Sequence, residues 1–341
     1  MKKIYFRVLT VILGIFLLCG LFAGCTKKNA GNSKDEVVTV KLNEVTRSIF
    51  YAPMYAAITE GFFEEEGIKI DLSTGQGADK TMQQLISGNV DIGFSGPEQV
   101  IYIYNQGRDD LPVVFAQLTQ KDGSFLVSKD KHSDFSWQDI KGSTLIGGRP
   151  GGMPEMALEY VLEKEQIDKE KDISLVTNIS FDAIPGAFLG GTGDYAALFE
   201  PNATLIAKET GGEIVASVGE SAGNLPYTCF YALESYMKEN RDLLVRFVRA
   251  IDKGQEWVMK TDDKTVAESI KEFFTGTDAD VISQVVSNYK KIEAYASTPE
   301  VNEEDINRLM DIIQHYDSEL ITNRPPFDKI VDNSLAEEAT K

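Results

Sequence analysis

The sequence predicts an α/β protein built from two lobes of the same plan. Strand-like apolar runs alternate with helical patterns, and short connections join them, which is typical of parallel sheets with crossover helices. A weak internal repeat also relates two stretches of the chain when 103 is added to the residue number. It places Lys41 on Thr144 and Asp91 on Asp194. The two stretches are therefore expected to form two sheets of one topology.

The first stretch has the pattern of three strands alternating with three helices. β-Branched and alternating apolar residues favour strands, whereas apolar residues three and four positions apart favour helices. Ser87 and Gly88 end the second helix, and Pro97 suits the first turn of the third. The predicted strands are 37–42, 68–72 and 90–94, and the predicted helices are 51–63, 78–86 and 95–104.

The second stretch repeats this order, and two apolar, aromatic runs flank it. Its predicted elements are strands 143–147, 173–176 and 194–199 and a helix, 154–163. The flanking runs, 125–128 and 227–233, are expected to be strands that cross between the lobes. Periodic apolar residues then predict helices 239–260, 263–274, 278–292 and 302–315.

These elements predict a division of the chain into domains. Lobe one comprises 36–130 and 226–322, and lobe two comprises 131–225. The tail, 323–341, is expected to be loose because it holds two prolines and many charges. Two lobes joined by crossing strands are expected to close around a ligand by a hinge motion.

The N-terminus predicts secretion and lipid anchoring. Residues 1–24 read as a signal peptide: a basic start, an apolar run over 8–22 and the small pair Ala23-Gly24. Cys25 follows at once, which resembles the lipobox of bacterial lipoproteins, although Phe22 replaces the usual leucine. The resemblance implies lipidation of Cys25, a polar tether over 25–35 and attachment at the outer face of the cell membrane. A membrane-spanning anchor and acylation of Cys19 are the weaker alternatives.

Composition excludes several classes of function. The chain carries a net charge of −19, and removing the three basic residues of the signal brings it to −22. Such a protein is repelled by nucleic acid. Only His132 and His315 are present, both in polar surroundings, so a zinc site or a Ser-His-Asp triad is not expected. Without its signal and with Cys25 acylated, the chain keeps only Cys229 and forms no internal disulfide.

Four short motifs indicate a family. They are FYAPMYAA at 50–57, EGFFEEEGI at 60–68, GNVDIGF at 88–94 and GDYAA at 193–197. Together they resemble the solute-binding proteins of ABC importers in the nitrate, sulfonate/taurine and thiamine-precursor class. The resemblance implies a two-lobed periplasmic-binding-protein fold of type II, each lobe a sheet with flanking helices. It also implies a monomer without cofactor that carries a small solute to a membrane permease with cytoplasmic ATPase subunits.

Ligands of open α/β sheets bind beyond the carboxyl ends of the strands, where helix N-termini add partial positive charge. The candidate contacts in lobe one are Ser48, Phe50, Tyr51, Gln76, Gly77, Ser95, Gly96, Glu98, Gln117 and Thr119. In lobe two they are Arg149, Gly151, Gly152, Met153, Phe199 and Glu200. The glycine turn is expected to offer backbone N–H groups to an oxyanion, with Tyr51 closing over it.

The charge of the ligand stays open at this point. Helix N-termini and Arg149 favour an anion, whereas Glu98, Glu200 and Glu44 favour an amine or an aminopyrimidine. An aliphatic sulfonate of the taurine type is the first expectation, with a pyrimidine thiamine precursor next and nitrate third. An enzyme resembling a pyrimidine synthase is a rival of another class, but histidine and cysteine are missing near the predicted site. An adhesive lipoprotein is a further rival.

Overall fold

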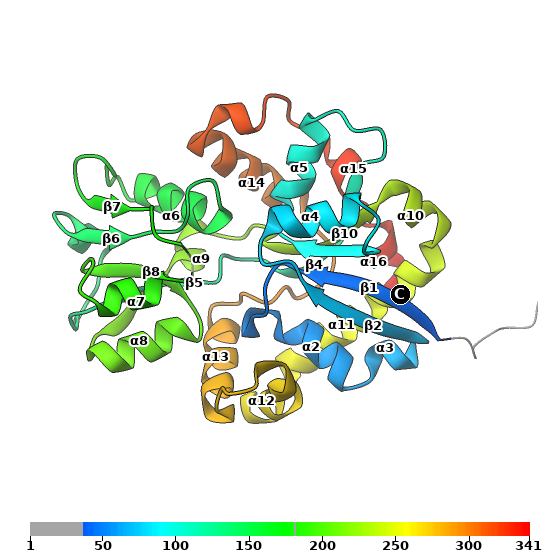
Figure 1. The fold of residues 1–341 in the computed structure, drawn as a ribbon, viewed down its shortest axis with the longest axis horizontal. Coiled ribbons are helices and arrows are strands. Elements are labelled where there is room, and N and C mark those ends of the chain that lie inside the picture. Colours follow the sequence, from blue (N-terminus) through cyan, green and yellow to red (C-terminus); the bar gives the residue numbers. More distant parts are fainter. Residues whose placement is uncertain (1–36, 181) are drawn as a thin grey trace, which may run out of the picture. The chain divides into compact units, whose positions relative to one another are not determined.

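The computed structural model describes residues 37–180 and 182–341. The predicted signal peptide, Cys25 and the tether lie outside the described residues. Within the described part, two five-stranded sheets form two α/β lobes (Figure 1). The prediction of two sheets with flanking helices is confirmed.

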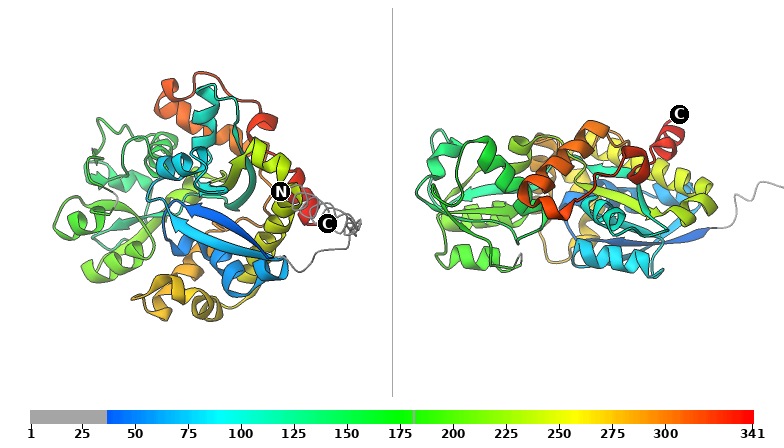
Figure 2. Two further views of the ribbon diagram at one scale, coloured as in Figure 1. Left: turned by 45° about the vertical axis from the view of Figure 1, so that its right-hand side comes forward. Right: turned by 90° about the horizontal axis from the view of Figure 1, so that it is seen from above.

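The sheet of lobe one has the strand order β2-β1-β3-β10-β4. β1, β2 and β3 are parallel, and β10 is antiparallel to both of its neighbours. Helices cover both faces, as two further views show (Figure 2). The strands are β1 (Val38–Glu44), β2 (Ile68–Thr74), β3 (Ile92–Ser95), β4 (Pro112–Thr119) and β10 (Thr228–Leu233). The first helices are α2 (Ala52–Thr59), α3 (Phe62–Glu65), α4 (Ala78–Ile86) and α5 (Glu98–Asn105).

The sheet of lobe two, β7-β6-β8-β5-β9, repeats this order element for element. β6, β7 and β8 are parallel, and β5 is antiparallel to both β8 and β9. Its strands are β5 (Ser124–Ser128), β6 (Thr144–Ile146), β7 (Ser174–Val176), β8 (Tyr195–Phe199) and β9 (Glu213–Ser217). Its helices are α6 (Met153–Lys164), α7 (Ile184–Leu189), α8 (Asn202–Thr210) and α9 (Val218–Ala222).

One side-chain hydrogen bond occurs at the same place in both lobes and confirms the internal repeat. Asp91 Oδ2 accepts from the backbone N–H of Lys41 at 2.8 Å. Asp194 Oδ2 accepts from the backbone N–H of Thr144, also at 2.8 Å. In each pair the backbone N–H of the aspartate returns a bond to the partner's carbonyl. The aspartate therefore fixes the start of the third strand against the first strand in both sheets.

Three helices predicted as continuous are divided. The segment 263–274 forms α12 (Asp263–Ile270) and a 3₁₀ helix (Lys271–Phe274). The segment 51–63 forms a short 3₁₀ helix (Ile49–Tyr51), α2 and α3, because Gly61 adopts a φ of +79° between the last two. That left-handed conformation interrupts an α-helix and suits glycine. The segment 239–260 divides near Asn240 into α10 (Glu234–Glu239) and α11 (Arg241–Lys260).

The C-terminal helices touch both lobes. α11 packs against α2 and α3 of lobe one. α13 contacts the 3₁₀ helix of lobe one and also binds Glu200 of lobe two through Asn288. α14 packs on α6 of lobe two. The bounds are α12 (Asp263–Ile270), a 3₁₀ helix (Lys271–Phe274), α13 (Ala279–Lys291), α14 (Glu303–Tyr316) and a second 3₁₀ helix (Ser318–Leu320).

The prediction of a loose tail is wrong. The tail forms α15 (Phe327–Ile330) and α16 (Ser334–Ala339), which pack on β4, and α16 also packs on α11. Leu335 is buried, and the Asn333 side chain exchanges hydrogen bonds of 2.9 and 2.8 Å with the backbone of Val301. Pro325 and Pro326 precede α15, and the buried residues Leu335, Ala336 and Ala339 give α16 an apolar face.

Leu335→Ala is expected to lower the free energy of unfolding by about 2–4 kcal/mol, because it leaves a cavity where α16 meets the core. Urea denaturation of the mature chain measures the change. Lys341→Ala, at the exposed last residue, is the control and should leave the unfolding midpoint unchanged. An unchanged midpoint in Leu335→Ala would mean that the tail contributes nothing to the fold.

Candidate functional site

Glu98 is a buried carboxyl group at the carboxyl end of β3, where the sequence predicts ligand contacts. It opens α5 and is 5% exposed. Its Oε1 accepts a bond of 3.3 Å from Gln99 Nε2, whereas Oε2 is buried without a partner among the described residues. A Cβ on Gly96 would lie 1.9 Å from Oε2, so a glycine is required here for the carboxyl group to fit. Leaving such an atom unpaired costs about 1–3 kcal/mol.

Tyrosines surround this carboxyl group. Burial raises the pKa of Glu98 from 4.5 to about 7. Burial also raises the pKa values of Tyr51, Tyr102 and Tyr231, and the negative charge of Glu98 adds to the effect. The Tyr231 hydroxyl lies 2.6 Å from Ser95 Oγ, while the buried Tyr102 hydroxyl has no partner among the described residues. The Glu98 carboxyl group and the surrounding tyrosine hydroxyls can therefore accept or donate hydrogen bonds in a buried setting.

An aromatic cluster centred on Phe50 joins the lobes. The Phe50 ring lies 5.6 Å from Tyr51, 6.0 Å from Phe199 of lobe two and 5.8 Å from Tyr227, measured between centroids. A Cβ on Gly123 would come within 2.9 Å of both Phe50 and Phe199. The structure thus brings the predicted contacts Phe50, Tyr51 and Phe199 together beside the crossing segments.

Glu200 directly follows Phe199 of the aromatic cluster, but its carboxyl group already has hydrogen-bond partners. Its oxygens accept bonds from the Thr204 backbone at 2.9 Å, the Thr204 hydroxyl at 2.7 Å and Asn288 Nδ2 at 2.5 Å. These partners come from α8 of lobe two and from α13. Glu200 therefore joins the two helices in this conformation rather than presenting a free acceptor.

The glycine turn before α6, residues 147–152, makes its contacts with other parts of the protein. Gly151 has a φ of +76°, and its N–H donates to the Tyr316 hydroxyl at 3.0 Å. A Cβ on Gly147 would lie 2.5 Å from an oxygen of the fully buried Glu155, so this glycine makes room for that side chain. One of the N–H groups that the sequence assigns to an oxyanion is thus bound to α14. Arg149 is exposed.

The remaining predicted contacts have varied settings. Ser48 caps the first 3₁₀ helix through Phe50 N, and Gln117 Nε2 donates to the Glu300 carbonyl at 2.6 Å. Thr119 is buried, and its hydroxyl has no partner among the described residues. Met153 is buried at the start of α6. Gln76 is exposed in the loop before α4, and neighbouring Gly77 has a φ of +146°.

The sequence analysis missed Asp122, Tyr102, Tyr227 and Tyr231 as candidate contacts. Asp122 is fully buried in the connection between β4 and β5, and its carboxyl group interacts with the Tyr227 hydroxyl. Tyr227 lies just before β10 and is 7% exposed. Tyr227 opens the predicted crossing run 227–233, which was the available signal, whereas Asp122 lies before the predicted run 125–128.

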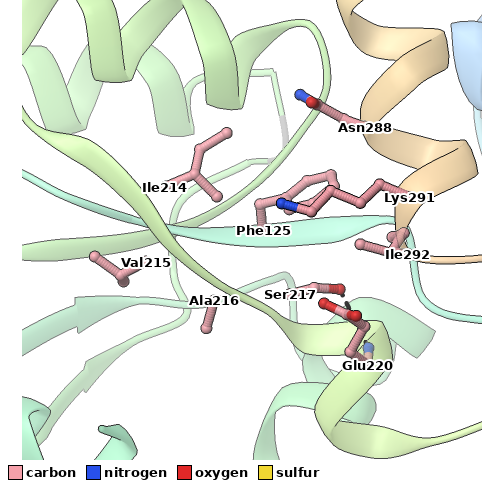
Figure 3. A pocket seen from close by; sticks show the side chains of 9 residues that line it. All are labelled: Phe125, Ile214, Val215, Ala216, Ser217, Glu220, Asn288, Lys291 and Ile292. Atoms are coloured by element: carbon pink, nitrogen blue, oxygen red, sulfur yellow. Dashed lines mark hydrogen bonds between the residues drawn. The ribbon is translucent and has the colours of Figure 1, made fainter. Parts of the chain in front are cut away.

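A cavity of about 280 Å³ lies elsewhere, between β9 and α13 (Figure 3). Its lining includes Ile214 and Ala216 of β9, exposed Glu220 of α9 and exposed Lys291 of α13. None of the predicted site residues lines it. Within residues 37–180 and 182–341, no cluster of three or more metal-ligating side chains occurs, and no helix is long and apolar enough to cross a membrane.

Comparison with known proteins places this geometry in a family. Residues 49–265 match the family described as NMT1/THI5 like. The chain belongs to this family. YtlA of Bacillus subtilis (strain 168), provisionally named a binding protein, is 44% identical over 326 residues, which are 96% of this chain and 95% of YtlA. The formylaminopyrimidine-binding protein of Halalkalibacterium halodurans is 25% identical over 76% of this chain and 77% of its own length.

The fold also recurs in a solved structure. The periplasmic aliphatic sulphonate binding protein SsuA from Escherichia coli superposes with a TM-score of 0.70 at 14% identity, covering 88% of this chain and 99% of SsuA. At this identity the likeness concerns the fold alone. The predicted two-lobed periplasmic-binding-protein fold is confirmed.

The ionisation of Glu98 is expected to make stability depend on pH. Its pKa is about 7 in the folded protein against an ordinary value of 4.5, so the folded state holds the proton more tightly. On account of this group, the free energy of unfolding falls as the pH rises through that interval. Glu98→Gln abolishes the ionisation. Its free energy of unfolding relative to that of the wild type should therefore be higher at pH 8 than at pH 5, by up to roughly 3 kcal/mol.

Urea denaturation at both pH values measures this difference. Exposed Glu64→Gln is the matched control and should follow the wild type. The same pH dependence in wild type and Glu98→Gln would show that Glu98 does not titrate as a buried acid.

Proposed function

We propose that the mature chain is the extracytoplasmic solute-binding lipoprotein of an ABC importer. Membership of the NMT1/THI5-like family and 44% identity to a protein named as a binding protein support this function. The partners would be a membrane permease and its ATPase subunits, and the chain would act as a monomer. An enzyme is disfavoured, because His132 lies near Ser128 and Tyr195 while His315 pairs with Glu163 on α6, and neither histidine contacts Glu98 among the described residues.

The buried, half-partnered carboxyl group of Glu98 is the observation that carries the choice of solute. Its free Oε2 is an acceptor, and a protonated carboxyl group can also donate. A solute with an amino group beside a ring nitrogen, as in an aminopyrimidine, complements both atoms. The relative from Halalkalibacterium halodurans is named a formylaminopyrimidine-binding protein, and a formylaminopyrimidine is of the same chemical class.

A sulfonate has less support at this position. No lysine, arginine or histidine is buried among the described residues, whereas Glu98 and Asp122 are. A desolvated sulfonate beside these groups would lack a cationic partner, which is costly. The first expectation from sequence therefore becomes the second candidate.

Calorimetric titration of the mature protein tests the solute class. We expect an aminopyrimidine to bind and taurine, an alkanesulfonate and nitrate not to bind. Glu98→Ala removes the acceptor and should weaken aminopyrimidine binding at least tenfold, since one hydrogen bond to a charged group contributes about 1.5–3 kcal/mol. Glu64→Gln is the control, and mass spectrometry of the recovered solute should show no turnover. Sulfonate binding that is insensitive to Glu98 would select the second candidate.

The lipid anchor is tested separately. Cys25→Ser removes the thiol that would be acylated and should release the protein from the membrane fraction into the extracytoplasmic space. Fractionation and immunoblotting measure the distribution, with Cys229→Ser as the control at a buried cysteine of the folded body. Retention of Cys25→Ser in the membrane fraction would contradict the lipoprotein assignment.

A further inference from the structure

Glu155 places a buried carboxyl group directly behind the glycine turn, on the third residue of α6. It is fully buried, and no well-directed donor reaches either of its oxygens among the described residues. The polar groups that act on it are the Gly148 N–H and the carboxyl group of Glu159, one helical turn further along α6. Two adjacent carboxyl groups in a buried place need an explanation, because an uncompensated buried charge is costly.

The packing ties the position of this carboxyl group to that of the turn. A Cβ on Gly147 would lie 2.5 Å from Glu155 Oε2 and 3.2 Å from the Leu175 side chain of β7. A Cβ on Gly148 would lie 3.0 Å from the backbone nitrogen of Glu155. The turn and the side chain fit against each other without spare room, so a displacement of the carboxyl group also displaces the turn.

The turn and the glutamate pair both contact α14. The Gly151 N–H donates to the hydroxyl of Tyr316, the last residue of α14, at 3.0 Å. Lys169, in the loop after α6, has its Nζ 2.6 Å from Glu159 Oε2 and 5.8 Å from the centroid of the Tyr316 ring. Lobe two therefore meets the same residue of α14 by two routes, one through the turn and one through the glutamate pair.

One proton shared by the pair explains how two carboxyl groups lie together here. Two neighbouring buried carboxylates do not both ionise, and the group that keeps its proton can donate to the other. Glu159 is the ionised member, since it pairs with Lys169. Burial is the largest cause that raises the pKa of Glu155 from 4.5 to about 8, and the charge of Glu159 adds to it. The Gly148 N–H and the Lys169 charge act in the opposite direction.

Other titratable groups on the elements around α6 have different partners. α14 presents His315 to Glu163, at 2.9 Å, and Tyr316 to the turn. α9, which also packs on α6, carries Glu220, and this side chain lines the separate cavity beside β9. The protonation of Glu155 is therefore coupled to Glu159 and Lys169 rather than to these groups.

We propose that the proton shared by Glu155 and Glu159 is a pH-sensitive switch of the contact between lobe two and α14. With the proton in place, the pair stays behind the turn and the turn stays bonded to Tyr316. As the pH rises, a state in which Glu155 has moved into water and ionised becomes more favourable, and the turn then separates from α14. This switch does not depend on the identity of the solute.

Hydrogen–deuterium exchange of the mature protein, followed by mass spectrometry of peptides that span the turn, tests the switch. A group with a raised pKa in the closed state favours opening progressively between its ordinary and its raised pKa. The exchange rate at Gly151, corrected for the intrinsic rate, should therefore rise about tenfold or more between about pH 5.5 and about pH 7.5 in the wild type. Glu155→Gln cannot ionise and should show no such rise.

Three further variants make the result specific. Glu98→Gln removes the other acid with a strongly raised pKa and should keep the rise. Tyr316→Phe removes the acceptor of the Gly151 N–H and should exchange fast at both pH values. Glu159→Gln removes the neighbouring charge and should diminish the rise, and it decides alone if Glu155→Gln does not fold by circular dichroism. An equal rise in the wild type and the folded glutamine variants of the pair, or no rise in the wild type, would overturn the switch and leave the proposed function intact.

Discussion

The antiparallel pairing of the two connections between the sheets is the constraint on which the candidate site depends. Bonds from Tyr227 to Thr119 and from Leu225 to Gln120 keep the two crossings in contact. With the crossings held together, Phe50 of lobe one meets Phe199 of lobe two and Tyr227 at one junction. A protein joined by a single flexible linker could not hold aromatic and carboxyl groups from distant parts of the chain in one place, because each additional ordered residue costs conformational entropy.

The junction also concentrates groups that a folded core normally avoids. Glu98 and Asp122 are buried, one oxygen of Glu98 is unpaired among the described residues, and neither carboxyl group has a cationic neighbour that lowers its pKa. Desolvation raises the pKa of both groups. The rest of the protein must offset this cost, and the large apolar core of each lobe supplies the offset. Groups retained at a cost to stability are typical of binding sites, where a ligand supplies the missing partners.

Sequence patterns predicted the fold well and the site only in part. The repeat of Asp91 and Asp194 predicted two sheets of one plan, because a short polar side chain bonding to a neighbouring strand leaves a positional signature. The apolar tail helix around Leu335 was missed, since prolines and charges masked a short buried face. At the site, Glu98 was identified from its place after a strand, whereas Asp122 lay in a turn whose burial depends on contacts with Gly219 far along the chain. The hydrogen bond from Asn288 to Glu200 joins residues that are equally far apart in the chain, so residue spacing could not predict it.

The C-terminal helices set the cost of separating the lobes. Tyr289 of α13 donates to the Gly123 carbonyl and accepts from the Glu200 N–H, both at 3.2 Å, and Tyr316 of α14 accepts from Gly151 N–H. Parting of the lobes would exchange these bonds, and the Asn288 bond, for bonds to water, at a net cost of about 0.5–1.5 kcal/mol for each neutral bond and about 1.5–3 for the charged one. These four bonds together contribute about 3–7.5 kcal/mol, against the roughly 8 kcal/mol that a solute bound at micromolar affinity provides. A solute that contacts groups on both sides of the junction shifts the balance between parted and joined lobes by the difference between its affinities for the two states.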